Sequence, residues 1–178
     1  MSAPIGTVLL DLDGVLMDHT RAAQEAIRGW LGARLTPEVE AAWFAAQERW
    51  LAAWRSGAAT WEEQRRNRLK DVLPLVGEVV GPDDELDALF ASGYGAAYRR
   101  AWHGFEDAEP AIRALHDAGI ATAVLTNGAE DQQTAKLRGV GLGDLVGPVF
   151  TAGALDLRKP DPRAFLAACE RLGVAAQR

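Results

Sequence analysis

The feature that most constrains the fold is an apolar run, residues 8–12, which contains one acid and is followed by a second acid and a glycine. Such a run is typical of a strand buried on both faces, and we expect this strand over residues 7–12. Asp11 and Asp13 would then point the same way, and Gly14 would allow a sharp turn. The pattern predicts two acids at the carboxyl end of a central strand, where open α/β sheets bind ligands. Taken alone, it also fits an ordinary polar turn.

Two further apolar strands are followed by polar residues that can carry chemistry. A strand predicted over 121–125 leads into a Thr-Asn-Gly segment, residues 126–128, and a short strand over 149–151 precedes Lys159. Helical patterns separate these strands. Strands that alternate with helices indicate a parallel sheet with right-handed crossovers.

About eighty residues between the first two strands carry helical patterns without a strand signal. Their apolar spacing predicts four helices, the last of them continuous over 86–101, and Thr60 with Glu63 forms a capping box for the third. We interpret the five tryptophans of this block as packing core rather than as the lining of a substrate pocket. We interpret its basic cluster as a solvated helix face rather than as a contact for an anionic substrate. The cluster consists of Arg65, Arg66, Arg68 and Lys70.

Composition and charge argue against several classes of function. A net charge of −6 argues against general nucleic-acid binding, which depends on a basic surface. No apolar run approaches the roughly 20 residues needed to span a bilayer, and the first residues lack a secretory signal pattern. The single cysteine, Cys169, cannot form an internal disulfide, and we interpret it as a small buried or half-buried side chain. We therefore expect a cytoplasmic protein that binds neither membrane nor nucleic acid.

The ordered motifs together resemble the haloacid dehalogenase-like (HAD) hydrolase superfamily over nearly the whole chain. The resemblance implies a Rossmann-like parallel sheet core with an inserted α-helical cap that closes over the site and selects the substrate. The core would comprise residues 1–16 and 103–178, and the cap residues 17–102. The motifs that carry the resemblance are Asp11-Leu12-Asp13-Gly14-Val15, Thr126-Asn127 and Lys159-Pro160.

Residue roles follow from the same resemblance and agree with the chemistry of the side chains. Asp11 would be the nucleophile and a Mg²⁺ ligand, since carboxylates form aspartyl-phosphate intermediates and Mg²⁺ prefers oxygen ligands. Asp13 would be the general acid and base, and would give the metal its backbone carbonyl. Lys159 would supply positive charge to the phosphoryl group. The residues expected to bind the phosphoryl oxygens are Thr126, Asn127 and Gly128.

The implied function is Mg²⁺-dependent hydrolysis of a small phosphate ester. The branch that the chain resembles includes pyrimidine nucleotidases, sugar-phosphate phosphatases and phosphoglycolate phosphatase. Three alternatives stay open: a HAD-fold protein that binds a ligand without catalysis, a haloacid dehalogenase, and a phosphoryl mutase. Asp13 favours a phosphatase over a dehalogenase, because a halide leaves without a proton whereas an alkoxide leaving group needs one.

The family's fourth motif, an acidic segment that completes the Mg²⁺ site, is missing after Lys159. Asp161 falls at a helix start and Glu170 within the helix. We therefore expect a C-terminally truncated core, derived from a longer enzyme, with weak Mg²⁺ binding and impaired turnover. The strand over 8–12 would be left as an exposed apolar edge, and such edges favour self-association.

Overall fold

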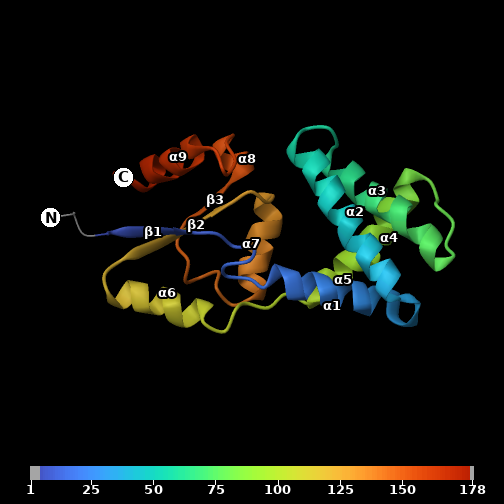
Figure 1. Ribbon diagram of the computed structural model, residues 1–178. Helices are drawn as coiled ribbons and strands as arrows, with labels where there is room; N and C mark the ends of the chain where they lie inside the picture. The colour runs from blue at the N-terminus through green and yellow to red at the C-terminus, as the bar shows by residue number, and fades with distance from the viewer. Residues whose placement is uncertain (1–4, 177–178) are drawn as a thin grey trace. The chain divides into compact units, whose positions relative to one another are not determined.

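The structure is a computed structural model, and it describes residues 5–176. The chain separates into two compact units (Figure 1). The α/β unit combines the residues up to Thr20 with those from Trp102 onward, and the helical unit spans Arg21–Ala101. The helical unit is therefore an insertion in the sequence of the α/β unit. The predicted α/β fold with a helical insertion is confirmed.

A three-stranded parallel sheet with strand order β1–β2–β3 organises the α/β unit. The pairing register aligns the strands closely, because Leu10 lies opposite Val124, and Val124 lies opposite Val149. The carboxyl ends of the strands consequently lie at one edge of the sheet. The strands are β1 (Thr7–Leu10), β2 (Ala121–Thr126) and β3 (Val149–Thr151).

Helices cover both faces of this sheet, as Figure 1 shows for α6 (Ala108–Asp117) and α9 (Pro162–Leu172). On the α6 face, a His116 ring nitrogen hydrogen-bonds to Thr122 Oγ1 at 2.9 Å. The next residue of β2 points the opposite way and belongs to a buried apolar cluster under α9. The cluster contains Ala123, Leu125, Phe150, Leu155 and Ala168.

The remaining helices of the α/β unit follow local sequence signals. Helix α7 (Glu130–Gly139) connects β2 to β3, in agreement with the helical pattern expected between these strands. Helix α9 begins as predicted, since the Asp161 carboxylate accepts a hydrogen bond from the Arg163 N–H at 2.9 Å. The short α8 (Ala152–Leu155) was not predicted; the Thr151 hydroxyl caps it by accepting from the Ala154 N–H at 3.2 Å.

The helical unit confirms one predicted helix start and corrects one predicted helix. Thr60 and Glu63 form the reciprocal capping box. The single helix expected over 86–101 is wrong, because the chain breaks at Gly93. A Cβ at Gly93 would lie 2.4 Å from Trp30 Nε1 and 2.7 Å from the Leu89 carbonyl oxygen. The elements are α1 (His19–Leu31), η1 (Gly32–Arg34), α2 (Pro37–Arg55), α3 (Trp61–Val72), η2 (Leu73–Val76), α4 (Asp83–Ser92) and α5 (Tyr94–Arg100).

Aromatic side chains form the centre of the helical unit. Trp43 is fully buried, and its ring centroid lies 5.4 Å from that of Trp30 and 4.5 Å from that of Tyr94. Arg68 is only 5% exposed, so the expectation that it lies on a solvated helix face is wrong. Its guanidinium stacks 4.3 Å from the Trp43 ring centroid and donates to Gln47 Oε1 at 2.7 Å. Stacking on an aromatic ring lets an arginine lie in a core without a carboxylate partner.

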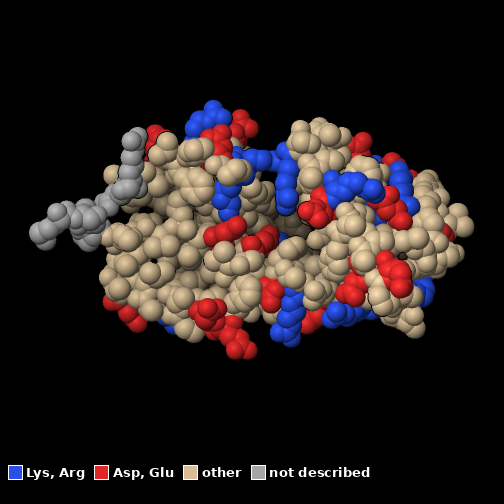
Figure 2. Space-filling model, in the orientation of Figure 1, with Lys and Arg blue, Asp and Glu red and all other residues tan. Residues whose placement is uncertain are grey.

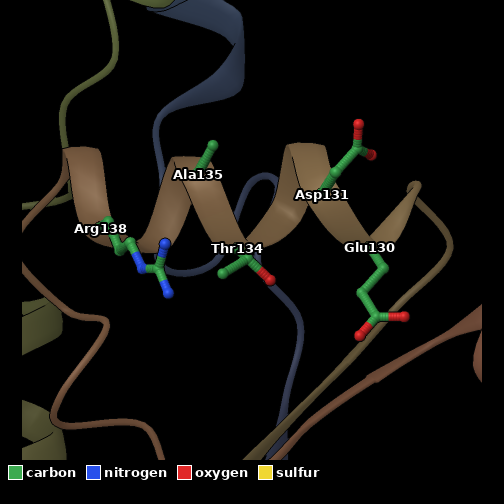
Figure 3. Close-up of a pocket in the computed structure, with 5 residues that line it drawn as sticks. All are labelled: Glu130, Asp131, Thr134, Ala135 and Arg138. Carbon is green, nitrogen blue, oxygen red and sulfur yellow. The ribbon is translucent and has the colours of Figure 1, made fainter.

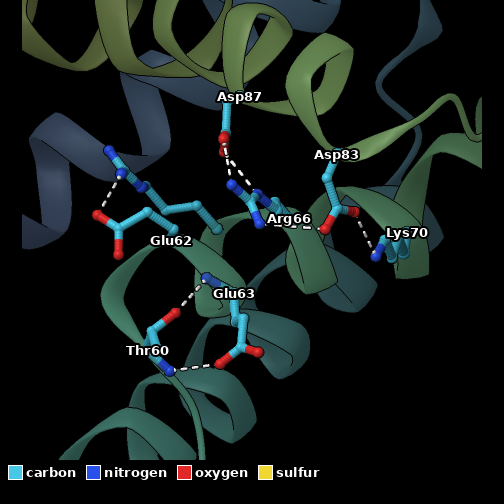
Figure 4. Close-up of polar contacts among 8 residues, drawn as sticks. Thr60, Glu62, Glu63, Arg66, Lys70, Asp83 and Asp87 are labelled. Atoms are coloured by element: carbon cyan, nitrogen blue, oxygen red, sulfur yellow. Dashed lines mark hydrogen bonds and ion pairs between the residues drawn. The ribbon is translucent and has the colours of Figure 1, made fainter.

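Arg66 and Lys70 of the basic cluster reach the surface and pair with acids of α4 (Figure 4). Arg66 donates to Asp83 at 3.1 Å and also contacts Asp87, and Lys70 donates to Asp83 at 2.9 Å. Figure 2 shows basic and acidic side chains interspersed on the face in view. Across residues 5–176, the structure contains no helix that is long and apolar enough to cross a membrane.

Candidate active site

The first site residues lie in a tight loop directly after β1. The strand ends at Leu10, so the range expected from the sequence, residues 7–12, was two residues too long. The Leu12 carbonyl oxygen accepts hydrogen bonds within the loop instead of from a neighbouring strand. Gly14 adopts a left-handed φ of 86°. Three backbone N–H groups donate to that carbonyl, those of Val15, Leu16 and Met17.

Asp11 lies against Lys159. Lys159 Nζ is 2.7 Å from Asp11 Oδ1, and the Leu12 N–H donates to the same oxygen at 2.8 Å. The Asp11 side chain is 40% exposed, whereas that of Lys159 is 18% exposed. The carboxylate is thus held at one oxygen and remains accessible to a solute.

Asn127 fixes the backbone that carries Lys159. Its side-chain amide accepts from the Lys159 N–H at 2.8 Å and donates to the Lys159 carbonyl oxygen at 2.9 Å. Two reciprocal hydrogen bonds of this kind hold a loop segment in one place relative to the end of β2. Asn127 therefore fixes the backbone of Lys159, and the phosphoryl contact expected for it stays a prediction.

Asp13 is enclosed by two side chains of α7. Lys136 Nζ lies 2.7 Å from Asp13 Oδ1 and 2.8 Å from Oδ2, and Gln133 Nε2 donates to Oδ2 at 3.2 Å. Burial on its own would raise the pKa of Asp13. The charge of Lys136 and the hydrogen bonds from Lys136 and Gln133 outweigh that effect, so the pKa of Asp13 lies below its usual value.

Thr126 and Gly128 complete the site at the end of β2. Thr126 is 2% exposed, and its Oγ1 accepts from Gln133 Nε2 at 2.6 Å and from the Gly128 N–H at 3.4 Å. Hydrogen bonds and an ion pair, together with the peptide bond between Thr126 and Asn127, link six residues into one series, which we call the contact ring. Its members are Asp11, Lys159, Asn127, Thr126, Gln133 and Asp13.

The structure brings together all six residues that the sequence singled out, and it adds two. Gln133 and Lys136 were not predicted, because only the ends of this helix, and not the residues on its faces, were inferred from the sequence. A signal was present: both are polar, yet they share a helix face with the buried Leu137. Polar residues on the buried face of a short helix point to polar partners in the interior.

The opposite side of α7 is solvent-facing and separate from the contact ring. Figure 3 shows a shallow pocket there, with the side chains that line it. None of these side chains belongs to the contact ring, so this pocket and the candidate active site are different places on the protein. They are Glu130, Asp131, Thr134, Ala135 and Arg138.

Two oxygen groups of the site suit a small divalent cation. The Asp11 carboxylate and the Asp13 backbone carbonyl are hard donors of the type that Mg²⁺ takes, with water and substrate phosphate as its other ligands. Within residues 5–176, no cluster of three or more His, Cys, Asp or Glu side chains could hold a metal without such help. The donor set fits Mg²⁺ bound together with a phosphate rather than a metal held by protein side chains alone.

Sequence relatives of the chain include named phosphatases. A phosphatase of Mycobacterium tuberculosis is 32% identical over 174 residues, covering 96% of this chain and 75% of the relative. A phosphoglycolate phosphatase of Thiobacillus denitrificans is 30% identical over 180 residues, covering 97% and 71%. A phosphoserine phosphatase of Thermus thermophilus is 38% identical over 79 residues, covering 44% of this chain. The match spans 32% of that last protein, about a third of its length.

Solved structures share the fold. A HAD-hydrolase of Bacillus subtilis bound to magnesium superposes with a TM-score of 0.73 at 22% identity, covering 98% of this chain and 75% of that one. The L-2-haloacid dehalogenase of Xanthobacter autotrophicus gives a TM-score of 0.68 at 26% identity, covering 98% and 67%. The family match extends over residues 5–178 and includes every member of the contact ring. The chain belongs to the haloacid dehalogenase-like hydrolase family.

Proposed function

We propose that this hydrolase cleaves small phosphate monoesters through an aspartyl-phosphate on Asp11, with Mg²⁺ as cofactor. The observation that carries the proposal is the pairing of Asp11 with Lys159 beside the buried Thr126 and Asp13. A nucleophile, a cation, a hydroxyl and a second carboxyl group at one sheet edge match the needs of phosphoryl transfer. The phosphatase relatives support the same reaction class.

In the first step an oxygen of Asp11 attacks phosphorus and the bond from phosphorus to the leaving oxygen breaks. Oδ1 is held by Lys159 and by the Leu12 N–H, so we assign the attack to Oδ2. The Lys159 ammonium lies next to the charge that spreads over the phosphoryl oxygens in the transition state. The Thr126 hydroxyl can orient one of those oxygens.

Asp13 transfers the proton in both steps. Its pKa lies below the usual value in the free chain, and the negative charge of a bound phosphate ester would raise it, so that Asp13 takes up a proton with the substrate. It gives this proton to the leaving oxygen as the first bond breaks, which releases the alcohol. It then takes a proton from the water that attacks the aspartyl-phosphate, which releases inorganic phosphate and restores Asp11. Atoms and charges balance over the two steps, with water consumed and an alcohol and phosphate formed.

Mg²⁺ would be held by the Asp11 carboxylate and the Asp13 carbonyl, and would supply positive charge to the phosphoryl oxygens.

Asp13 also helps to choose between phosphate hydrolysis and dehalogenation, the reaction named for the Xanthobacter structural neighbour. In carbon–halogen cleavage the halide leaves without a proton, so a carboxyl group enclosed by Lys136 and Gln133 would have no leaving group to protonate. The phosphatase is therefore the proposal we favour.

The test compares the wild-type chain with Asp11→Asn on p-nitrophenyl phosphate and on a panel of sugar, nucleotide and small carboxylate phosphates, with and without Mg²⁺. We expect Mg²⁺-dependent release of phosphate by the wild type and a loss of at least about 1,000-fold in Asp11→Asn, because no covalent intermediate can form. Asp161→Asn, whose carboxylate caps α9, is the matched control and should keep the activity. Phosphate release that survives Asp11→Asn, or chloride release from 2-chloropropionate, would contradict the proposal.

A further inference from the structure

Helix α7 directs two polar side chains into the interior that the proposed reaction does not use. Gln133 is fully buried, and the Lys136 side chain is 5% exposed. The two residues are three positions apart, so they lie on one face of the helix. Burying a lysine and a glutamine costs free energy unless their polar atoms are hydrogen-bonded. Lys136 Nζ and Gln133 Nε2 are both bonded to the same carboxylate, whereas Gln133 Oε1 is buried without a hydrogen-bond partner among the described residues.

That carboxylate belongs to Asp13, whose backbone lies outside the sheet. Because β1 ends at Leu10, Asp13 lies past the sheet, and its backbone forms an isolated β-bridge with Met17 in the loop. Lys136 contacts both of its oxygens, at 2.7 and 2.8 Å, and Gln133 contacts one of them at 3.2 Å. Three contacts from one helix therefore define where the carboxylate lies.

Gln133 also connects Asp13 to the end of β2. The same Nε2 that donates to Asp13 donates to Thr126 Oγ1 at 2.6 Å. Gly128 makes room for this amide, since a Cβ there would lie 2.4 Å from Gln133 Cδ and 2.5 Å from Nε2. The spacing between the proton-transfer group and the hydroxyl at the phosphate position thus depends on one side chain.

We propose that Gln133 and Lys136 are positioning residues that hold the Asp13 carboxyl group in place to protonate the leaving oxygen. The inference rests on the proposed function and deepens it. Neither residue needs to touch the substrate, because each acts through Asp13. Gln133 sets the distance between Asp13 and Thr126, and Lys136 pairs with the carboxylate that remains once the proton has been given away.

The test uses Gln133→Met and Lys136→Met and measures kcat/KM, with saturating Mg²⁺, for phosphate esters of differing leaving-group pKa. The series runs from 2,4-dinitrophenyl through p-nitrophenyl and phenyl phosphate to glycerol 1-phosphate. For the alkyl ester, which needs protonation, we expect a loss of about 100-fold. For the dinitrophenyl ester, which leaves as a stable anion, we expect a loss of less than about 5-fold.

Matched controls separate positioning from a general loss of structure. Gln132→Met and Arg138→Met change the neighbouring glutamine and an exposed cation of the same helix, and should leave kcat/KM unchanged across the series. Gly128→Ala should reproduce the leaving-group dependence of Gln133→Met without a substitution in α7, because the new methyl group displaces the Gln133 side-chain amide. This second variant keeps the test informative if a buried-site variant fails to fold.

An equal loss on every ester, or no loss, in Gln133→Met and Gly128→Ala would overturn the positioning role. If Asp11→Asn abolishes turnover in the same experiments, the proposed function stands while the inference about α7 falls. Phosphate release that persists in Asp11→Asn, or a wild-type chain without any turnover, overturns both.

Discussion

Both units contain pairs of carboxylates and cations, but the pairs differ in burial and in what they connect. In the α/β unit, Lys136 and Lys159 are largely buried and reach acids that are more than 100 positions away in the sequence. In the helical unit, Arg66 and Lys70 are more exposed and join α3 to α4 (Figure 4). A buried pair in which one member is a reactive group serves chemistry, whereas an exposed pair adds little to stability.

The largest expected effect comes from removing the charge beside Asp11, the proposed nucleophile. Lys159→Met should lower kcat/KM for phosphate esters by about 100- to 1,000-fold, the usual result of deleting one group that stabilises transition-state charge. Steady-state kinetics check this, and a thermal melt should show little change because Lys159 contributes no core packing. If kcat/KM were unchanged, the buried pair of the α/β unit would have no more effect on activity than the exposed pairs of the helical unit.

A second variant addresses the aromatic centre of the helical unit. Trp43→Ala removes a fully buried ring and should decrease the free energy of unfolding by about 3–5 kcal/mol. Urea denaturation followed by circular dichroism measures it, and Trp43→Phe, which keeps an aromatic surface for Arg68, should lose less. A midpoint equal to that of the wild type would show that this cluster does not stabilise the unit.

The smallest expected effect concerns the surface pairs and depends on pH. Hydrogen bonding from Arg66 lowers the pKa of Asp87, and hydrogen bonding from Lys70, with the nearby Arg66, lowers the pKa of Asp83. An acid whose pKa is lowered on folding stabilises the fold above its unfolded value, 3.8 for Asp, and that stabilisation is lost as the pH falls through the folded value.

Arg66→Met should therefore lower Tm slightly at neutral pH, and the difference from wild type should shrink as the pH falls below 3.8. Melts of wild type and variant over a pH series measure the difference. Arg21→Met, which removes an exposed pair of α1 with Glu25, is a matched control for loss of a surface cation. A difference in Tm that grows on acidification would have the wrong sign for this explanation.

The sequence predicted the three strands, and the six candidate site residues that follow them lie close together, because strand ends and turn residues are local signals. It placed the end of β1 too late, since Leu12 is apolar and fully buried, although its carbonyl already belongs to a turn. It also missed the break at Gly93, which depends on the close approach of Trp30. Gln133 and Lys136 were not predicted, because their partner, Asp13, lies about 120 positions away in the sequence.

Every member of the contact ring comes from the α/β unit, although its sequence is interrupted by the helical insertion. The proposed reacting groups are thus encoded apart from the residues of the helical insertion, Arg21–Ala101. Exchanging this insertion between homologous proteins would test whether the proposed chemistry stays with the α/β unit while the choice of substrate changes with the insertion.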